Sequence, residues 1–233
     1  MPVTTVFFDF GGTLLIMRRD RIISTILSEV GYSADPEQVH SAYFSVEPSW
    51  LEVYGDKKMT GEETEEAYRR LDAMIFRLMF PGRREDEVDR VSTLMRLGWP
   101  RVEKTVPLEL YPDALPTLEA LKAGGYKLGM VSNAPPDTVD VIEALGLRRF
   151  FPVVLVSGVV GVSKPNPEIF RMALGQAGAK PEETVHVGDV YEADVVGARN
   201  AGIKGVLLDR NGSRPMPDCP CIQSLSEIYP HLR

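Results

Sequence analysis

Several polar side chains suited to metal and oxyanion binding stand just after short apolar runs of the sequence. They are Asp9, Ser132, Asn133, Lys164, Asp189 and Asp194. Carboxylate oxygens suit a hard cation such as Mg²⁺, whereas an ammonium group, a hydroxyl group and backbone N–H groups suit a phosphate or another oxyanion. If the apolar runs are strands of one parallel sheet, the side chains that follow them meet at its carboxyl edge, where ligands bind. The sequence therefore predicts a site for a metal ion and an oxyanion, assembled from separate segments.

The stretch VFFDFGGTL at residues 6–14 carries the first of these side chains. Its Val and Phe residues favour a strand, which would deliver Asp9 to the strand's carboxyl end. Gly11, Gly12 and Thr13 follow in a loop whose backbone can approach a ligand closely. We therefore expect this loop to contact the substrate.

The elements that must position these residues alternate along the second half of the chain. Apolar runs predict buried strands at residues 4–9, 126–131, 152–156, 184–187 and 205–208. Helical patterns occupy residues 113–122, 138–145, 166–178 and 192–201. Short apolar strands that alternate with helices indicate a parallel sheet covered on both faces, as in a Rossmann-like α/β fold. In this arrangement Asp194 lies about one helical turn after Asp189 and can face the same edge of the sheet.

Residues 18–105 have a different, helical pattern throughout. Four helices are expected to begin near residues 19, 35, 60 and 84, and the last is expected to end at residue 97, before Gly98-Trp99-Pro100. We interpret the chain as a discontinuous α/β core domain, residues 1–16 and 108–233, with a four-helix domain, residues 17–107, inserted after the first strand.

Composition and charge limit the classes of function. The chain has 233 residues and a formal net charge of −7, which argues against a general affinity for nucleic acid or for an anionic membrane surface. No apolar run is long enough for a signal peptide or a membrane span. Cys219 and Cys221 are too close together for an easy disulfide and lack partner histidines for a zinc site. We expect reduced thiols and a cytoplasmic location, and the sequence leaves the oligomeric state open.

Taken together, the four polar segments resemble the ordered motifs of the haloacid dehalogenase-like (HAD) hydrolase superfamily. The matching segments are DFGGT at 9–13, VSN at 131–133, SKPNP at 163–167, and VGD at 187–189 with Asp194. The tail DVVGARNAG at 194–202 is also typical of the family. The resemblance covers everything except the helical insert, which in turn resembles the family's C1 cap domain.

The resemblance implies a role for each matching residue. Asp9 is the expected nucleophile, which attacks phosphorus and forms an aspartyl-phosphate. Ser132 is expected to bind the oxygens of the transferring group, and Lys164 to neutralise the nucleophile and the developing charge. The implied holders of Mg²⁺ are Asp9, the backbone carbonyl of Gly11, Asp189 and Asp194. The expected substrate is a small phosphorylated metabolite.

Gly11 departs from the family's phosphatase pattern, in which a second aspartate two residues after the nucleophile acts as general acid and base. Three explanations stay open. The chain is a phosphatase that uses a cap group or an easily expelled leaving group; or it is a metal-independent 2-haloacid dehalogenase; or it is a low-activity homologue that binds a phosphorylated ligand. The dehalogenases usually have Ser-Asn where this chain has Gly188-Asp189, so the retained acids favour a Mg²⁺-dependent phosphatase.

Further residues near the motifs are candidates for recognising the substrate. Arg18 follows the first motif closely enough to reach a carboxylate or a second phosphate of the substrate. Asn133, beside Ser132, is also expected to bind the substrate. The three histidines share no metal-ligand spacing, and His186 lies within a predicted strand. We assign none of them to catalysis.

Overall fold

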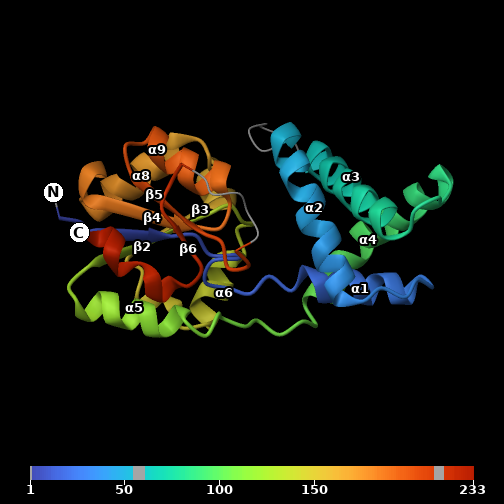
Figure 1. The fold of residues 1–233 in the computed structure, drawn as a ribbon, viewed down its shortest axis with the longest axis horizontal. Helices are drawn as coiled ribbons and strands as arrows, with labels where there is room; N and C mark the ends of the chain where they lie inside the picture. Colours follow the sequence, from blue (N-terminus) through green and yellow to red (C-terminus); the bar gives the residue numbers. More distant parts are fainter. Residues whose placement is uncertain (1, 55–60, 213–217) are drawn as a thin grey trace. The chain divides into compact units, whose positions relative to one another are not determined.

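The computed structural model describes residues 2–54, 61–212 and 218–233, and for residues 47–54 it describes the backbone alone. The chain forms two compact units, one of residues 1–16 and 109–233 and the other of residues 17–108 (Figure 1). The first unit contains a β-sheet and the second consists of helices.

The sheet of the α/β unit is six-stranded and parallel throughout. Its strands are β1 (Thr5–Phe8), β2 (Lys127–Ser132), β3 (Val153–Val156), β4 (Thr184–Gly188), β5 (Lys204–Leu208) and β6 (Cys221–Ile222). Their order in the sheet is β3-β2-β1-β4-β5-β6. This arrangement confirms the predicted Rossmann-like α/β fold and adds β6, a two-residue edge strand that the sequence did not suggest.

β1 lies in the middle of the sheet, where both of its faces are buried. Phe8 is paired with Met130 of β2 and with Val187 of β4. Phe7 belongs to an apolar cluster with Phe170, while Phe8 lies edge-to-face against Phe151 with ring centroids 6.3 Å apart. Because both phenylalanines are buried, the register of β1 and hence the position of Asp9 are firmly fixed.

Helices cover both faces of the sheet, with α8 and α9 on one face and α5 on the other (Figure 1). The helices of this unit are α5 (Ala114–Ala123), α6 (Thr138–Ala144), α7 (Ser157–Val160), α8 (Pro167–Ala177) and α9 (Gly197–Asn200). α9 is preceded by a π-helical segment, Tyr191–Val196. Asn166 caps α8, because its side chain accepts a hydrogen bond from the backbone N–H of Glu168.

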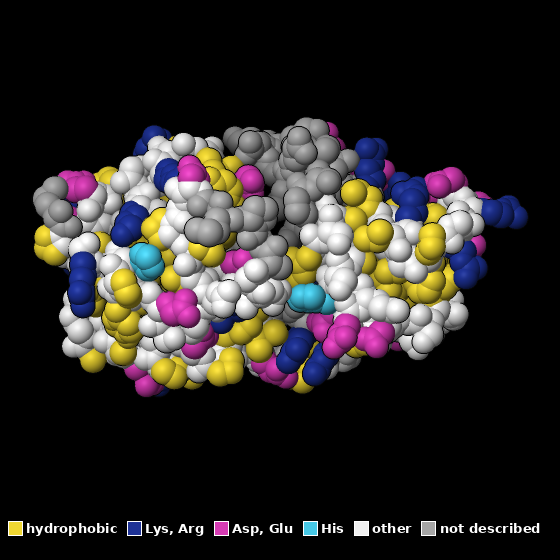
Figure 2. Space-filling view, viewed as in Figure 1, with side chains coloured by type: hydrophobic (Ala, Val, Ile, Leu, Met, Phe, Trp, Pro, Cys, Tyr) yellow, Lys and Arg dark blue, Asp and Glu magenta, His cyan; other side chains and the backbone are white. Residues whose placement is uncertain are grey.

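The helical unit packs its helices around an apolar core of its own. Its members are α1 (Arg19–Glu29), α2 (Pro36–Tyr54), α3 (Gly61–Met79) and α4 (Glu85–Glu103). The expected start of the third helix at residue 60 lies outside the described residues. Acidic and basic side chains are interspersed on the visible surface (Figure 2). Within the helical unit, Arg69 and Arg70 both pair with Glu66. Among the described residues, none of the long helices carries the apolar stretch that a bilayer crossing requires.

The expected end of the fourth helix at residue 97 is wrong, because α4 continues through Pro100 to Glu103. A proline inside a helix typically costs about 3 kcal/mol. Continuing the helix buries Val102 in the core of the unit. A Cβ atom at Gly98 would lie 3.1 Å from the side chain of Ile26, so this glycine permits close packing of α4 against α1. Tertiary packing therefore outweighs the local signals that usually end a helix.

Two short connecting segments of the α/β unit run side by side where the chain leaves the unit and returns to it. Leu15 and Leu110 form an antiparallel bridge. The backbone N–H of Ile16 donates to the carbonyl of Glu109 at 2.8 Å, and that of Tyr111 donates to the carbonyl of Leu14 at 2.9 Å. The loop after Asp9 is thereby joined to the segment that leads into α5.

Candidate active site

Asp9 stands at the carboxyl end of the central strand, immediately after β1. Its backbone N–H donates to the carbonyl of Val187 at 2.9 Å, which extends the pairing with β4 by one residue. The side chain is almost completely buried, with 6% of the residue exposed. The sheet therefore delivers a buried carboxylate to the edge where ligands bind in folds of this kind.

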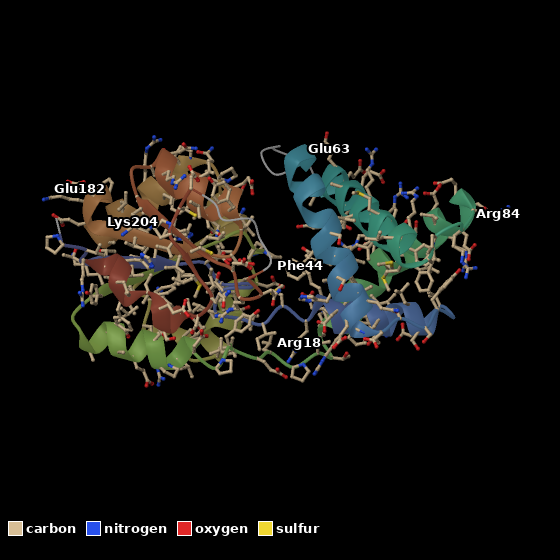
Figure 3. The ribbon with its side chains drawn as sticks, in the orientation of Figure 1. Arg18, Phe44, Glu63, Arg84, Glu182 and Lys204 are labelled. Atoms are coloured by element: carbon tan, nitrogen blue, oxygen red, sulfur yellow. The ribbon has the colours of Figure 1, made fainter. Side chains whose placement is uncertain are left out.

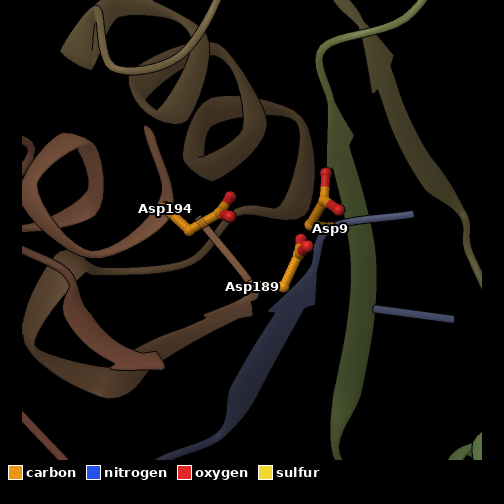
Figure 4. Close-up of side chains that lie close together, drawn as sticks. All are labelled: Asp9, Asp189 and Asp194. Carbon is orange, nitrogen blue, oxygen red and sulfur yellow. The ribbon is translucent and has the colours of Figure 1, made fainter. Parts of the chain in front are cut away.

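Three carboxylates converge at this edge of the sheet. One oxygen each of Asp9, Asp189 and Asp194 lies within 4.8 Å of the others, and Figure 4 shows the three side chains close together. In the part of the chain that the structure describes, no other group of three acidic, histidine or cysteine side chains is this close. An all-carboxylate donor set at this spacing fits a hard divalent cation such as Mg²⁺.

Lys164 lies between two of the three carboxylates. Its ammonium group is 2.6 Å from Oδ1 of Asp9 and 2.5 Å from Oδ1 of Asp194, and the side chain is 2% exposed. The backbone of Lys164 is held by the side chain of Asn133, which donates to its carbonyl and accepts from its N–H, both at 2.8 Å. Asn133 therefore fixes the segment that carries the lysine.

Asp194 belongs to the π-helical segment rather than to the α-helix expected over residues 192–201. Its Oδ2 accepts a hydrogen bond from the backbone N–H of Val190 at 3.0 Å, and its Oδ1 lies 2.9 Å from Nε2 of His186. Single π-helical turns often occur at functional sites, because the wider turn re-aims a side chain. Here the turn coincides with the carboxylate that pairs with Lys164.

Burial and charge pairing set the protonation states of these groups. Burial raises the pKa of Asp9, although Lys164 acts against this shift. Burial would also raise the pKa of Asp194, but Lys164 and His186 outweigh it and hold that pKa well below its usual range. The two carboxylates in turn raise the pKa of Lys164 despite its burial. The site thus holds a permanently charged ammonium group and is richer in carboxylates than in cations.

The loop after Asp9 closes on itself and packs against Asp189. Gly12 has φ of 84°, and a Cβ atom there would lie 2.2 Å from Oδ2 of Asp189, so only glycine fits. The backbone N–H of Gly12 donates to the carbonyl of Leu15 at 2.8 Å. The hydroxyl of Thr13 lies 3.4 Å from Oδ1 of Asp189. Gly11 is half-buried at the tip of the same loop and is bridged to Leu15.

Two further residues expected at the site lie in different parts of the chain. Ser132 is the last residue of β2, next in the sheet to β1, and is buried with 2% exposure. Arg18 is the residue before α1 and belongs to the helical unit (Figure 3). The α/β unit therefore brings all of the expected residues together except Arg18, whose contact with the substrate stays a prediction.

A comparison with known protein families identifies the family of this chain. A family model for the haloacid dehalogenase-like hydrolases matches residues 3–202. The chain belongs to the haloacid dehalogenase-like hydrolase family. This membership confirms the resemblance that the four motifs indicated, and it places the chain among the hydrolases.

Named relatives of this HAD-like hydrolase include phosphatases. Phosphoserine phosphatase of Thermus thermophilus is 44% identical over 107 residues, which are 46% of this chain and 43% of that relative. The chain therefore matches less than half the length of that protein. The pyrophosphatase PpaX of Bacillus mycoides is 30% identical over 209 residues, covering 89% of this chain and 84% of the relative.

Solved structures share the fold of the HAD-like hydrolase over its whole length. The putative HAD-hydrolase YfnB of Bacillus subtilis, whose structure was determined bound to magnesium, has a TM-score of 0.76 and 20% sequence identity. The match covers 100% of this chain and 99% of that one. At this level of identity the likeness concerns the fold alone.

His186 is a site residue of this HAD-like hydrolase that sequence reasoning did not select. It is fully buried in β4 and contacts Asp194 directly. The alternation of side chains along a strand contained the signal, because His186 and Gly188 share one face of β4. A Cβ atom at Gly188 would lie 2.1 Å from Cγ of Asp194, so Asp194 packs over that face.

Proposed function

We propose that this chain is a Mg²⁺-dependent phosphatase that hydrolyses a small phosphorylated metabolite through a phosphorylated Asp9. The observation that carries the proposal is the convergence of three carboxylates within 4.8 Å of one another, two of which pair with a buried, charged lysine. Membership of a hydrolase family and similarity to a phosphoserine phosphatase support it. In the metal-independent dehalogenase alternative, the carboxylates of Asp189 and Asp194 would have no metal cation to bind.

Each residue of the cluster has a distinct task in this reaction. Asp9, Asp189, Asp194 and the backbone carbonyl of Gly11 would hold Mg²⁺, which would supply positive charge next to the phosphoryl oxygens. A carboxylate oxygen of Asp9 attacks phosphorus while the bond from phosphorus to the ester oxygen breaks. Water then attacks the phosphorus of the aspartyl-phosphate, which releases phosphate and restores the carboxylate.

The neighbouring groups orient the reactants and balance charge. Lys164 keeps the carboxylate of Asp9 in place and offsets charge that develops on the phosphoryl oxygens. Ser132, at the end of the adjacent strand, donates a hydrogen bond to one of those oxygens. Asn133 acts mainly through the backbone of Lys164, since its amide group is already engaged there. Gly12 and Thr13 shape the loop that faces the substrate.

The glycine at position 11 restricts the leaving group. Without a carboxylic acid there, the departing oxygen receives no proton from this loop. Good substrates are therefore esters whose leaving group needs little protonation, such as acyl or aryl phosphates, or esters protonated by a group of the helical unit. We propose that this unit, residues 17–108, is a cap domain and that Arg18 contacts a second anionic group of the substrate. We also propose a cytoplasmic location for the chain.

The test is a phosphatase panel run beside a haloacid panel. The purified chain should hydrolyse p-nitrophenyl phosphate and acetyl phosphate with Mg²⁺, lose this activity with EDTA, and lose it in Asp9→Asn. Asp140→Asn, an exposed carboxylate in α6, serves as the matched control and should retain activity. Halide release from 2-chloropropionate without Mg²⁺ and without phosphatase activity would overturn the proposal in favour of a dehalogenase.

A further inference from the structure

Arg210, which belongs to none of the four motifs, contacts the loop that follows Asp9. It lies two residues beyond the end of β5. Its Nη2 donates to the backbone carbonyl of Thr13 at 2.8 Å. Thr13 is fully buried, and its hydroxyl is the group that faces Asp189. Arg210 therefore touches the backbone of the loop whose side chains and carbonyls border the carboxylate cluster.

Asp113 anchors the same guanidinium group from the other side. The two residues form a bidentate ion pair, with Nη1 3.0 Å from Oδ2 and Nη2 3.1 Å from Oδ1 of the carboxylate. Oδ2 also accepts hydrogen bonds from the hydroxyl of Ser224 at 2.8 Å and from the backbone N–H of Leu225 at 2.9 Å. A bidentate pair whose carboxylate accepts further hydrogen bonds has a well-defined orientation. The side chains of Arg210 and Asp113 are 16% and 19% exposed.

Tyr111 also contacts the guanidinium group of Arg210. The guanidinium carbon of Arg210 lies 3.6 Å from the centre of the tyrosine ring. Tyr111 also donates its backbone N–H to the carbonyl of Leu14, the neighbour of Thr13. Arg210 thus contacts both connecting segments, the one that leaves the α/β unit and the one that returns.

We infer that Arg210 is a positioning residue that holds the loop of residues 10–15 in one geometry beside the carboxylate cluster. The part of this inference that concerns turnover rests on the phosphatase function proposed above. The physical reason is that an ordered loop keeps Asp9 and the carbonyl of Gly11 in fixed relation to Asp189. A misplacement of about 1 Å in an active site can lower a rate by about 10²-fold.

The inference is tested on the full chain by two independent measurements. The first is hydrogen exchange, without Mg²⁺, of the backbone amides of Gly12, Leu14 and Leu15, which close the loop on itself. In Arg210→Met these amides should exchange about tenfold faster, as expected for loss of a hydrogen bond from a charged donor. Amides of β2 should exchange as in the wild type, which shows that the effect is local.

The second measurement is turnover of p-nitrophenyl phosphate. In Arg210→Met, kcat should fall roughly 10- to 100-fold with little change in KM, since the guanidinium group is already engaged by Thr13, Asp113 and Tyr111. Arg210→Lys keeps the charge but cannot form the bidentate pair, so it should show intermediate losses in both measurements.

Arg149 provides a matched control within the same unit. Its guanidinium carbon lies 4.7 Å from the centre of the Phe150 ring, and its Nη2 is 3.6 Å from Oε1 of Glu119, so it also combines an aromatic contact with an ion pair, but on the surface. Arg149→Met should change neither exchange nor turnover.

The outcomes separate this inference from the proposed function. Unchanged exchange of the loop amides in both Arg210 variants overturns it, whether or not the protein is a phosphatase. Faster exchange with unchanged kcat overturns its catalytic part. If the wild type hydrolyses no phosphate ester, the exchange measurement still decides the loop contact while the phosphatase proposal falls. If Arg210→Met does not fold, Arg210→Lys and Asp113→Asn decide by the same measurements.

Discussion

Lys164 and Asp9 form a buried ion pair 2.6 Å long between segments that are 155 residues apart in the sequence. The same ammonium group also pairs with Asp194, so one positive charge is shared by two carboxylates. This arrangement depends on the ammonium group of Lys164, because a buried charge without a partner strongly destabilises the folded state.

Replacing Lys164 with Met should therefore destabilise the folded chain by about 3–5 kcal/mol at neutral pH. Without the ammonium group, the pKa of Asp9 rises further above that of the unfolded chain, and His186 alone then opposes the effect of burial on the pKa of Asp194. The folded variant therefore takes up protons as the pH falls. The difference in the free energy of unfolding between wild type and Lys164→Met should be largest near pH 8 and shrink toward pH 5. Urea unfolding with EDTA at several pH values measures this difference. A deficit that stays constant across this range would contradict the explanation.

Replacing a glycine that packs against one of the carboxylates by alanine should lower activity. In Gly188→Ala the new Cβ atom would overlap Cγ of Asp194, so the carboxylate must move and activity should fall about 100-fold or more. Far-UV circular dichroism should stay as in the wild type. Gly175→Ala in α8 is the control, since nothing lies within 4 Å of its added Cβ atom and the helix should gain up to about 1 kcal/mol. Wild-type turnover in Gly188→Ala would disprove the close approach.

Gly11→Asp should restore a proton donor to the loop. Gly11, unlike Gly12, does not have a positive φ, so its backbone accepts a side chain. A positioned general acid typically contributes about 10²- to 10⁴-fold, which sets the upper limit of the gain. The gain in kcat should be largest for alkyl phosphates, whose leaving groups need a proton most, and small for p-nitrophenyl phosphate. Gly11→Asn is the control, and equal gains on both esters would count against proton donation.

Asp72 should make the stability of the helical unit depend on pH. It is 3% exposed, with Oδ2 3.1 Å from Nε of Arg96, and burial raises its pKa to about 7 although Arg96 acts against the shift. A folded-state pKa above the unfolded value of 3.8 stabilises the fold at low pH, and this stabilisation is lost as pH rises through about 7.

Asp72→Asn removes this titration, so its free energy of unfolding should rise relative to the wild type between pH 4 and pH 8. At about 1.36 kcal/mol per pKa unit the gain is at most about 4 kcal/mol. Arg96 keeps its contacts with the rings of Tyr68 and Trp99 in this variant. Asp89→Asn, at an exposed carboxylate paired with Arg69, is the control and should follow the wild-type profile. A difference between Asp72→Asn and wild type that does not change with pH would refute the prediction.

Local patterns in the sequence predicted the strands β1 to β5 and the polar residues that follow them, but not the edge strand β6. The apolar run before Asp9 and the run before Gly188 and Asp189 have the length and composition of buried parallel strands. The extension of α4 through Pro100 was not predictable in this way, since it depends on burying Val102 in the helical core. The hydrogen bond from Arg210 to the backbone carbonyl of Thr13 was also not predictable, because every residue has a backbone carbonyl and the sequence does not indicate which one is bound.

The bridge between Leu15 and Leu110 has a consequence for how such a chain can change over time. Since the outgoing and returning segments are hydrogen-bonded to each other, the sheet receives both ends of the inserted helices at a single paired point. An insertion of another length or another architecture can start and finish at that point without lengthening any loop of the sheet. The α/β unit and the inserted helical unit can therefore diverge at separate rates.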